Sequence, residues 1–339
     1  MLIDIVLLVV GLVVLVWSAD QFVLGSSRLA TLFKLPPIVI GAVVMGFGTS
    51  APELLVSTLA AVGGDRDLGV GNIIGSNVAN LSLVLGVAAL VTAMPMQGKV
   101  LRREGPLCIA ATLVFGAVVI DGEIARWEGA VLVGLLVGVL IYLIRSGRQE
   151  TLEDVLGDVE VEAITTGREV GRTLIGLVGT VLGAQLVVWG AVDIADSLGV
   201  TGGFIGFSLV ALGTSLPELV TTVASARRKE TELIIGNLFG SNIFNGLAVG
   251  GFMGLFGPGA IGDDSLTGFG LIAVVVITVL AFGMGVVGRK VGRVAAAVLL
   301  TLYVGVMVVL GFSDGSDDDE TAVHAEPSAS VPISVESRR

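Results

Sequence analysis

One stretch of the chain occurs twice, first as Gly48-Thr49-Ser50-Ala51-Pro52-Glu53-Leu54 and again as Gly213-Thr214-Ser215-Leu216-Pro217-Glu218-Leu219. The two copies are identical at six of seven positions and lie 165 residues apart. A second motif repeats at the same distance, at Gly71–Asn80 (GNIIGSNVAN) and Gly236–Asn245 (GNLFGSNIFN). Because the offset does not change between the motifs, the sequence predicts an internal duplication.

The composition places these halves in a membrane. Hydrophobic residues make up 54% of the chain and charged residues only 14%, with a mean hydropathy of +0.95, whereas soluble domains carry about 25% charged residues. Apolar stretches of about 20 residues, each long enough to cross a bilayer as a helix, recur throughout. The sequence therefore predicts an all-α integral membrane protein with ten transmembrane helices, at about 2–27, 38–61, 69–93, 105–120, 127–144, 173–195, 203–225, 233–256, 266–287 and 294–312.

Each half contains five predicted spans, so the second half enters the membrane upside down. The predicted organisation is a first five-helix repeat over residues 1–146, an acidic cytoplasmic connecting loop over 147–172, a second five-helix repeat over 173–312, and a disordered acidic tail over 313–339. Inverted-topology repeats are typical of secondary transporters, which bind their substrates near the bilayer midplane where the repeats meet.

The basic residues predict the orientation. Fifteen of the 19 Lys and Arg residues fall on one side of the predicted topology, and only Arg66 and Arg126 lie in loops on the other. The positive-inside rule then places both termini outside the cell.

Glu53 and Glu218 are expected near mid-bilayer, each about 15 residues into its span. A charge at this depth costs about 2.5–3.5 kcal/mol on insertion scales, and no Lys or Arg is expected at the same level. A transported cation is therefore the expected partner, and two carboxylates match the charge of one divalent ion.

Further oxygen ligands surround the two glutamates in the sequence. Pro52 and Pro217 each free the carbonyl four residues earlier, so each motif predicts a broken helix with exposed carbonyl oxygens. Hydroxyl and amide oxygens are supplied by Thr49, Ser50, Thr214, Ser215, Ser76, Asn80, Ser241 and Asn245. Such all-oxygen shells suit Ca²⁺ and Na⁺.

Other polar and small residues have a structural interpretation. Close packing or bonding between helices is expected for Gly71, Gly75, Gly236, Gly240, Asn72, Asn77, Asn237 and Asn242. Asp20, Asp193 and Asp196 are expected to be interfacial or structural, and Cys108 to lie in the apolar core. With one Cys and one His in the chain, no disulfide framework, zinc site or catalytic dyad is expected. No enzyme activity, cofactor or nucleic-acid partner is predicted.

The paired motifs resemble the two alpha-repeats of the sodium/calcium exchanger family, within the calcium:cation antiporter superfamily, and in size the chain resembles its compact prokaryotic members. The resemblance implies Na⁺/Ca²⁺ antiport across the cell membrane by alternating access, in a chain expected to be monomeric. It also implies that Glu53, Glu218 and the carbonyls of Thr49 and Thr214 bind calcium. The implied sodium positions use Ser50, Ser76, Ser215, Ser241 and the carbonyls of Gly46 and Ala211, with Asn80 and Asn245 completing the centre.

One residue departs from part of the family pattern. Asn245 stands where potassium-dependent exchangers and some prokaryotic members carry Asp, which argues against potassium coupling. Calcium/proton exchange in the same fold remains an alternative, because buried carboxylates readily take up protons. A cation channel or an intramembrane protease fits less well, since the chain has one paired site and lacks facing aspartates and a membrane histidine.

Overall fold

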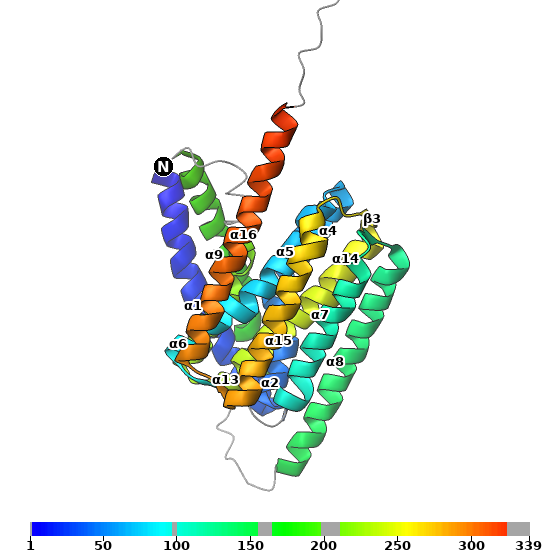
Figure 1. Ribbon diagram of the computed structural model, residues 1–339. Coiled ribbons are helices and arrows are strands. Elements are labelled where there is room, and N and C mark those ends of the chain that lie inside the picture. The colour runs from blue at the N-terminus through cyan, green and yellow to red at the C-terminus, as the bar shows by residue number, and fades with distance from the viewer. Residues whose placement is uncertain (1, 97–99, 155–164, 198–210, 324–339) are drawn as a thin grey trace, which may run out of the picture.

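The computed structural model describes residues 2–96, 100–154, 165–197 and 211–323 (Figure 1). Helices follow all ten predicted spans, except that the first part of the span predicted at 203–225 lies outside the described residues. The chain is an all-helical membrane protein, as predicted.

The first repeat contains a second span that is broken into several short helices. In chain order its helical elements are α1 (Leu2–Leu32), α2 (Pro37–Ile40), η1 (Gly41–Gly46), α3 (Phe47–Thr49), α4 (Ala51–Gly63), α5 (Arg66–Ala79), η2 (Asn80–Val84), α6 (Leu85–Val91), η3 (Val100–Glu104), α7 (Gly105–Val119) and α8 (Arg126–Asp154), where η marks a π-helical turn.

The second repeat follows the same plan. Its described helical elements are α9 (Thr166–Ser197), α11 (Ala211–Thr214), α12 (Leu216–Arg227), α13 (Thr231–Phe244), η5 (Asn245–Val249), α14 (Gly250–Phe256), η6 (Leu266–Gly270), α15 (Leu271–Gly288) and α16 (Arg293–Val323). Within the described residues, six helices are long and apolar enough to cross a membrane alone, and the bent pair Pro37–Thr49 and Ala51–Gly63 makes a seventh span. The apolar part of α16, Arg293–Val309, is shorter than these spans.

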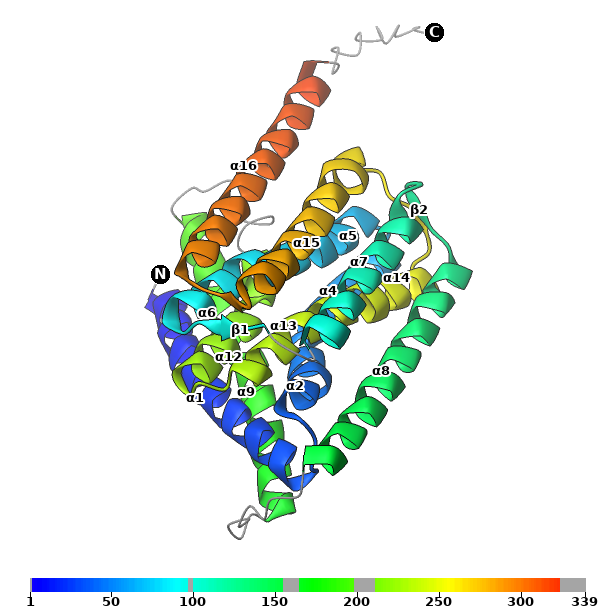
Figure 2. The ribbon, with the colours of Figure 1, turned by 60° about the horizontal axis from the view of Figure 1, so that its bottom comes forward.

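The first helices of the two repeats, α1 and α9, pack against each other in opposite directions (Figures 1 and 2). Gly25, late in α1, lies against Thr173, early in α9, while Gly190, late in α9, lies against Leu8, early in α1. Equivalent helices that run antiparallel are the geometric result of an inverted repeat.

The helices that carry the second motif form the centre of the bundle. The apolar window of Thr231–Phe256 is 100% buried and that of Arg66–Val91 is 78% buried, against 22% for Leu2–Leu32 and for Arg126–Gly147. Small residues allow the close approach: a Cβ atom on Gly240 would lie 2.5 Å from the Cα atom of Ala42, and one on Gly236 would meet the carbonyl oxygen of Ile38. The packing interpretation is thus confirmed for Gly236 and Gly240. A Cβ atom on Gly71 would lie 3.6 Å from Cδ2 of Leu266, which is an ordinary van der Waals contact. No described atom lies within 4 Å of a Cβ built on Gly75.

Two short strand ladders, which the sequence analysis did not anticipate, connect the repeats. β1 (Met94–Pro95) pairs antiparallel with β4 (Lys290–Val291), and β2 (Glu123–Ile124) pairs antiparallel with β3 (Gly259–Ala260). Figure 1 shows β3 at the upper end of the bundle and α6, which leads into β1, at the lower end. Each ladder therefore joins a connection of one repeat to a connection of the other.

Two predicted loop boundaries need correction. α8 continues to Asp154 and α9 begins at Thr166, so helices occupy much of the segment predicted as a connecting loop over 147–172. α16 continues to Val323, so residues 313–323 are helical although the tail was predicted to be disordered from residue 313. A helix that is already nucleated in the membrane adds further residues at low cost, which explains both extensions.

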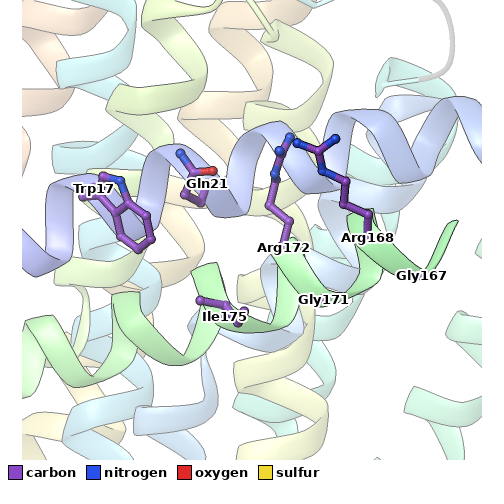
Figure 3. A pocket seen from close by; sticks show the side chains of 7 residues that line it. All are labelled: Trp17, Gln21, Gly167, Arg168, Gly171, Arg172 and Ile175. Atoms are coloured by element: carbon purple, nitrogen blue, oxygen red, sulfur yellow. The ribbon is translucent and has the colours of Figure 1, made fainter. Parts of the chain in front are cut away.

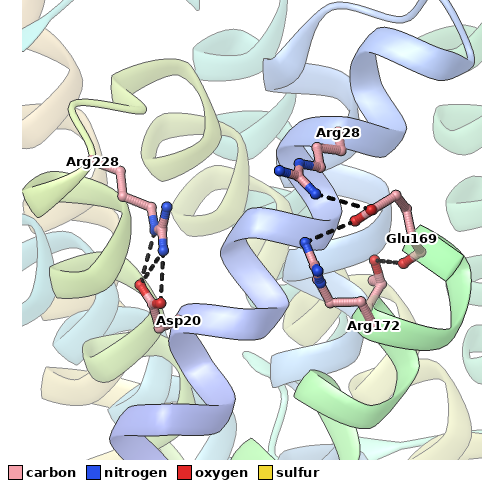
Figure 4. Close-up of polar contacts among 6 residues, drawn as sticks. Asp20, Arg28, Glu169, Arg172 and Arg228 are labelled. Atoms are coloured by element: carbon pink, nitrogen blue, oxygen red, sulfur yellow. Dashed lines mark hydrogen bonds and ion pairs between the residues drawn. The ribbon is translucent and has the colours of Figure 1, made fainter. Parts of the chain in front are cut away.

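Salt bridges fix α1 to the second repeat (Figure 4). Asp20 accepts hydrogen bonds from Nε and Nη2 of Arg228 at 2.9 and 2.6 Å, so its predicted structural role is confirmed. Arg28 lies 3.0 Å from the buried carboxylate of Glu169, which also contacts Arg172 at 3.2 Å. Asp193 is exposed, and the side chain of Asp196 lies outside the described residues. Cys108 is buried, as expected.

Candidate functional site

Both repeated motifs form broken helices. α3 ends at Thr49 and α4 begins at Ala51, with a bend of 45° between the two segments. In the second repeat α11 ends at Thr214 and α12 begins at Leu216. Ser50 and Ser215 occupy the breaks with nearly equal backbone angles (φ −85° and −87°, ψ 10° and 2°). The break predicted from the two prolines is therefore present in both repeats.

Glu53 and Glu218 follow these breaks in the first turns of α4 and α12, and both side chains have 0% exposure. The hydroxyl of Ser50 donates to Oε1 of Glu218 at 3.0 Å, so residues from both repeats meet at one place. Ser76 donates to Oε1 of Glu53 at 3.4 Å. The two carboxylates are close enough to interact electrostatically.

Other predicted ligand residues surround the same pair. The hydroxyl of Thr214 lies near the carboxylate of Glu53, and those of Thr49 and Ser241 lie near that of Glu218. Ser241 also donates to the carbonyl oxygen of Gly46 at 3.2 Å, which brings that carbonyl to the site. Ala211 begins α11, one helical turn before the break, and its side chain lies outside the described residues.

Fixed cations do not neutralise the glutamates in the described part of the chain. The ion pairs that the described residues form join Arg28 and Arg172 to Glu169, Arg103 to Glu104, and Arg228 to Asp20. None of them involves Glu53 or Glu218. The two acids are thus fully buried, and their partners among the described residues are neutral groups.

Several buried oxygen atoms in this region have no hydrogen-bond partner. They are Oε2 of Glu53, Oε2 of Glu218, Oδ1 of Asn80, Oδ1 of Asn245 and Oγ of Ser215. A buried acceptor left without a partner costs about 1–3 kcal/mol, and more if it is charged. Five such atoms from four helical segments make this region the candidate cation site.

Two asparagine bridges support the site in a symmetric way. Asn237 accepts from Thr49 at 3.4 Å and donates to Thr222 at 3.4 Å. In the other repeat Asn72 accepts from Thr214 at 3.2 Å and donates to Ser57 at 2.9 Å. Each bridge connects the broken helix of one repeat to the α4 or α12 helix of the other.

A second symmetric set of asparagines follows Ser76 and Ser241 within one helical turn. Asn80 donates to Oδ1 of Asn242 at 3.0 Å, and Asn245 donates to Oδ1 of Asn77 at 3.2 Å. Asn80 and Asn245 also begin the π-helical turns η2 and η5, and such turns are frequent at functional sites.

The predicted helix-to-helix bonding of Asn72, Asn77, Asn237 and Asn242 is confirmed by these contacts. Ser57 and Thr222 were missed as their partners. Both stand at equivalent positions 165 residues apart, so the repeat offset was the signal that pointed to them. The described residues contain no group of three or more His, Cys, Asp or Glu side chains that could hold a metal ion. A cation here would therefore use two carboxylates together with neutral oxygens.

A hollow of about 430 Å³ adjoins the site beside the broken helix of the second repeat. Its lining includes Pro52 of α4, Gly213 and Thr214 of α11, and Trp189 and Asp193 of α9. The glutamates themselves are fully buried, so their carboxylates are closed off from water in this conformation.

Comparison with known proteins agrees with this architecture. The family model described as sodium/calcium exchanger protein matches residues 3–145 and 169–312. Inner membrane protein YrbG of Escherichia coli is 37% identical over 267 residues, covering 77% of this chain and 82% of that protein. Sodium/calcium exchanger MaX1 of Methanosarcina acetivorans is 28% identical over 345 residues, covering 91% and 98% of the two chains.

Solved structures show the same fold. The sodium-calcium exchanger NCX_Mj, soaked with 2.5 mM Na⁺ and 10 mM Sr²⁺, is similar with a TM-score of 0.80 at 30% sequence identity. The similarity covers 91% of this chain and 98% of that one.

Proposed function

This chain belongs to the sodium/calcium exchanger protein family, and from that membership we propose that it exchanges Na⁺ for Ca²⁺ across the cell membrane. It is a transporter and not an enzyme. The observation that supports the choice of ions is the pair Glu53 and Glu218, buried together with an unpartnered oxygen on each and no described basic partner. Two negative charges and a shell of neutral oxygens suit one Ca²⁺, which takes 6–8 oxygen ligands, or Na⁺ ions in its place.

In the proposed calcium site, the carboxylates of Glu53 and Glu218 bind together with the carbonyls of Thr49 and Thr214. The proposed sodium positions share the glutamates and add the oxygens of Ser50, Ser76, Ser215, Ser241, Gly46 and Ala211, with Asn80 and Asn245 at the centre. Because both glutamates are closed off from water here, ions would enter and leave after a conformational change. Alternating access is the mechanism that such a closed state serves.

The proposed topology places both termini outside the cell. The start of α1 and the end of α16 lie toward the same end of the bundle (Figure 1), which agrees with an even number of crossings, and the basic residues favour the opposite side as the cytoplasm. The domain limits of 1–146 and 173–312 and the monomeric state remain predictions from the sequence.

Ion flux in proteoliposomes tests the coupling. Vesicles loaded with Na⁺ and diluted into Na⁺-free buffer are expected to take up ⁴⁵Ca²⁺, whereas an equally steep gradient of K⁺ drives none. A pH gradient imposed without Na⁺ is the decisive comparison, since the same carboxylates could exchange protons. Uptake driven by the pH gradient alone would replace sodium by protons as the coupling ion, and uptake that needs no counter-ion would indicate a channel.

Replacement of Asn245 by Asp is expected to change ion selectivity. The Oδ1 atom of Asn245 has no partner, and a carboxylate there would add a third negative charge within the proposed site. We expect the sodium concentration for half-maximal exchange to shift by at least about threefold, and potassium to compete where it did not before. The measurement is ⁴⁵Ca²⁺ flux against Na⁺ and K⁺ concentration, with Asn245→Ala as the comparison because it also removes the hydrogen bond to Asn77 but adds no charge. An unchanged ion profile in Asn245→Asp would show that this side chain serves packing only.

A further inference from the structure

A second hollow lies between α1 and α9, outside the glutamate site. Its volume is about 310 Å³, and its lining includes Trp17, Gln21, Arg168, Gly171, Arg172 and Ile175. Figure 3 shows the two arginines at one end of the hollow and Trp17 at the other, with Gln21 between them. We refer to it as the α1–α9 hollow.

The arginine end carries an excess of positive charge. Glu169 is buried and pairs with both Arg28 and Arg172 (Figure 4). Arg168 forms no ion pair with another residue that the structure describes. Arg172 thus shares the one carboxylate of Glu169 with Arg28, and Arg168 has no ionic partner among the described residues, so the two arginines that line the hollow are incompletely neutralised.

The opposite end faces outward and is apolar. Trp17 is 58% exposed and Ile175 is 62% exposed, on helices whose exposed side chains are largely hydrophobic, as expected for surfaces in contact with lipid. Arginine side chains at such a surface are costly unless they reach the headgroup region or an anion. The hollow thus has a cationic end near the start of α9 and an apolar end deeper along the same helix.

We propose that the α1–α9 hollow binds one anionic phospholipid. Its phosphate lies between Arg168 and Arg172, where guanidinium groups offer charge-assisted hydrogen bonds, and Gln21 is within the same hollow as a further donor. One acyl chain extends over Ile175 toward Trp17. Basic pockets between membrane helices are suited to anionic headgroups, and each Arg near an anionic surface adds about 1 kcal/mol. This proposal does not depend on which ions the protein exchanges.

Native mass spectrometry of the whole protein tests the charge requirement. Protein extracted from vesicles of equal phosphatidylglycerol and phosphatidylcholine is expected to retain one phosphatidylglycerol in preference to phosphatidylcholine. Arg168→Gln is expected to weaken retention about fivefold, the effect of one headgroup contact. The matched control is Arg145→Gln, which removes an exposed arginine of α8 outside the hollow and should leave retention unchanged. Equal retention of both lipids, or equal loss in both variants, would overturn the proposal.

A steric variant tests the hollow without altering charge. No described atom lies within 4 Å of a Cβ built on Gly171, so Gly171→Leu fills the hollow while the helix is retained. We expect it to lose the bound phosphatidylglycerol, whereas Gly138→Leu on α8, also in open space among the described residues, keeps it. If Gly171→Leu folds and retains the lipid as wild type does, the headgroup is bound elsewhere.

Discussion

Replacing either Glu53 or Glu218 by glutamine is expected to reduce calcium transport to the level of empty vesicles. Glutamine keeps the size of the side chain but removes one of the two charges in a fully buried site. A pair of unit charges 4 Å apart interacts by about 4 kcal/mol at an effective dielectric constant of 20, so calcium affinity should fall at least about 100-fold. The measurement is ⁴⁵Ca²⁺ flux together with calcium binding by calorimetry.

Folding of these variants provides the necessary control. Without ions the wild-type protein holds two carboxylates in a dry site, so removal of one charge is expected to leave the size-exclusion profile and thermal stability intact or improved. Glu232→Gln, which alters an exposed carboxylate in the first turn of α13, should transport normally. Sodium-driven calcium flux that persists in both Glu53→Gln and Glu218→Gln would remove the basis of the proposed site.

Replacement of Gly240 by alanine is expected to destabilise the centre of the bundle. The new Cβ atom would lie 2.5 Å from the Cα atom and 2.6 Å from the carbonyl oxygen of Ala42, and backbone atoms cannot move aside as a flexible side chain can. Overpacking of this kind costs about 1–3 kcal/mol and occasionally more. Because Ser241 is adjacent, transport should fall as well. Thermal unfolding in detergent measures the effect.

Gly138→Ala is the matched control for this prediction. It makes the same substitution in α8, at a position where no described atom lies within 4 Å of the added carbon, and alanine favours helix by about 1 kcal/mol. Its midpoint of unfolding should equal or exceed that of the wild type. An equal midpoint for Gly240→Ala and the wild type would mean that α13 and η1 separate easily, contrary to their close contact in the structure.

The fold was predictable because its two main determinants, the apolar runs and the internal repeat, are visible in a single sequence. Apolar runs of membrane length predicted the helices, the constant offset of 165 residues predicted the duplication, and the five spans in each half predicted that the second half is inverted. The broken helices followed from Pro52 and Pro217. These features depend on local chemistry and on repetition, both of which a single sequence contains.

The contacts between the halves were not predictable in the same way. Whether Asn237 accepts from Thr49 or faces another helix depends on how far each helix turns about its own axis, which only the packed bundle determines. The two-residue strands are too short to show an alternation of apolar and polar residues in the sequence. The ends of α8 and α16 extend beyond the apolar stretches from which these helices were predicted. Pairwise geometry between distant segments was the missing information.

The crossed ladders β1·β4 and β2·β3 have a consequence for the origin of such a chain. At both ends of the bundle a strand of one half pairs with a strand of the other, and each half contains only one of the two acids. A five-helix ancestor inserted in a single direction would thus be left with open strand edges and only one of the two buried acids. Both ladders and the pair of acids would form only when it associated with a second copy inserted in the opposite direction. Fusion of the two genes makes that arrangement permanent.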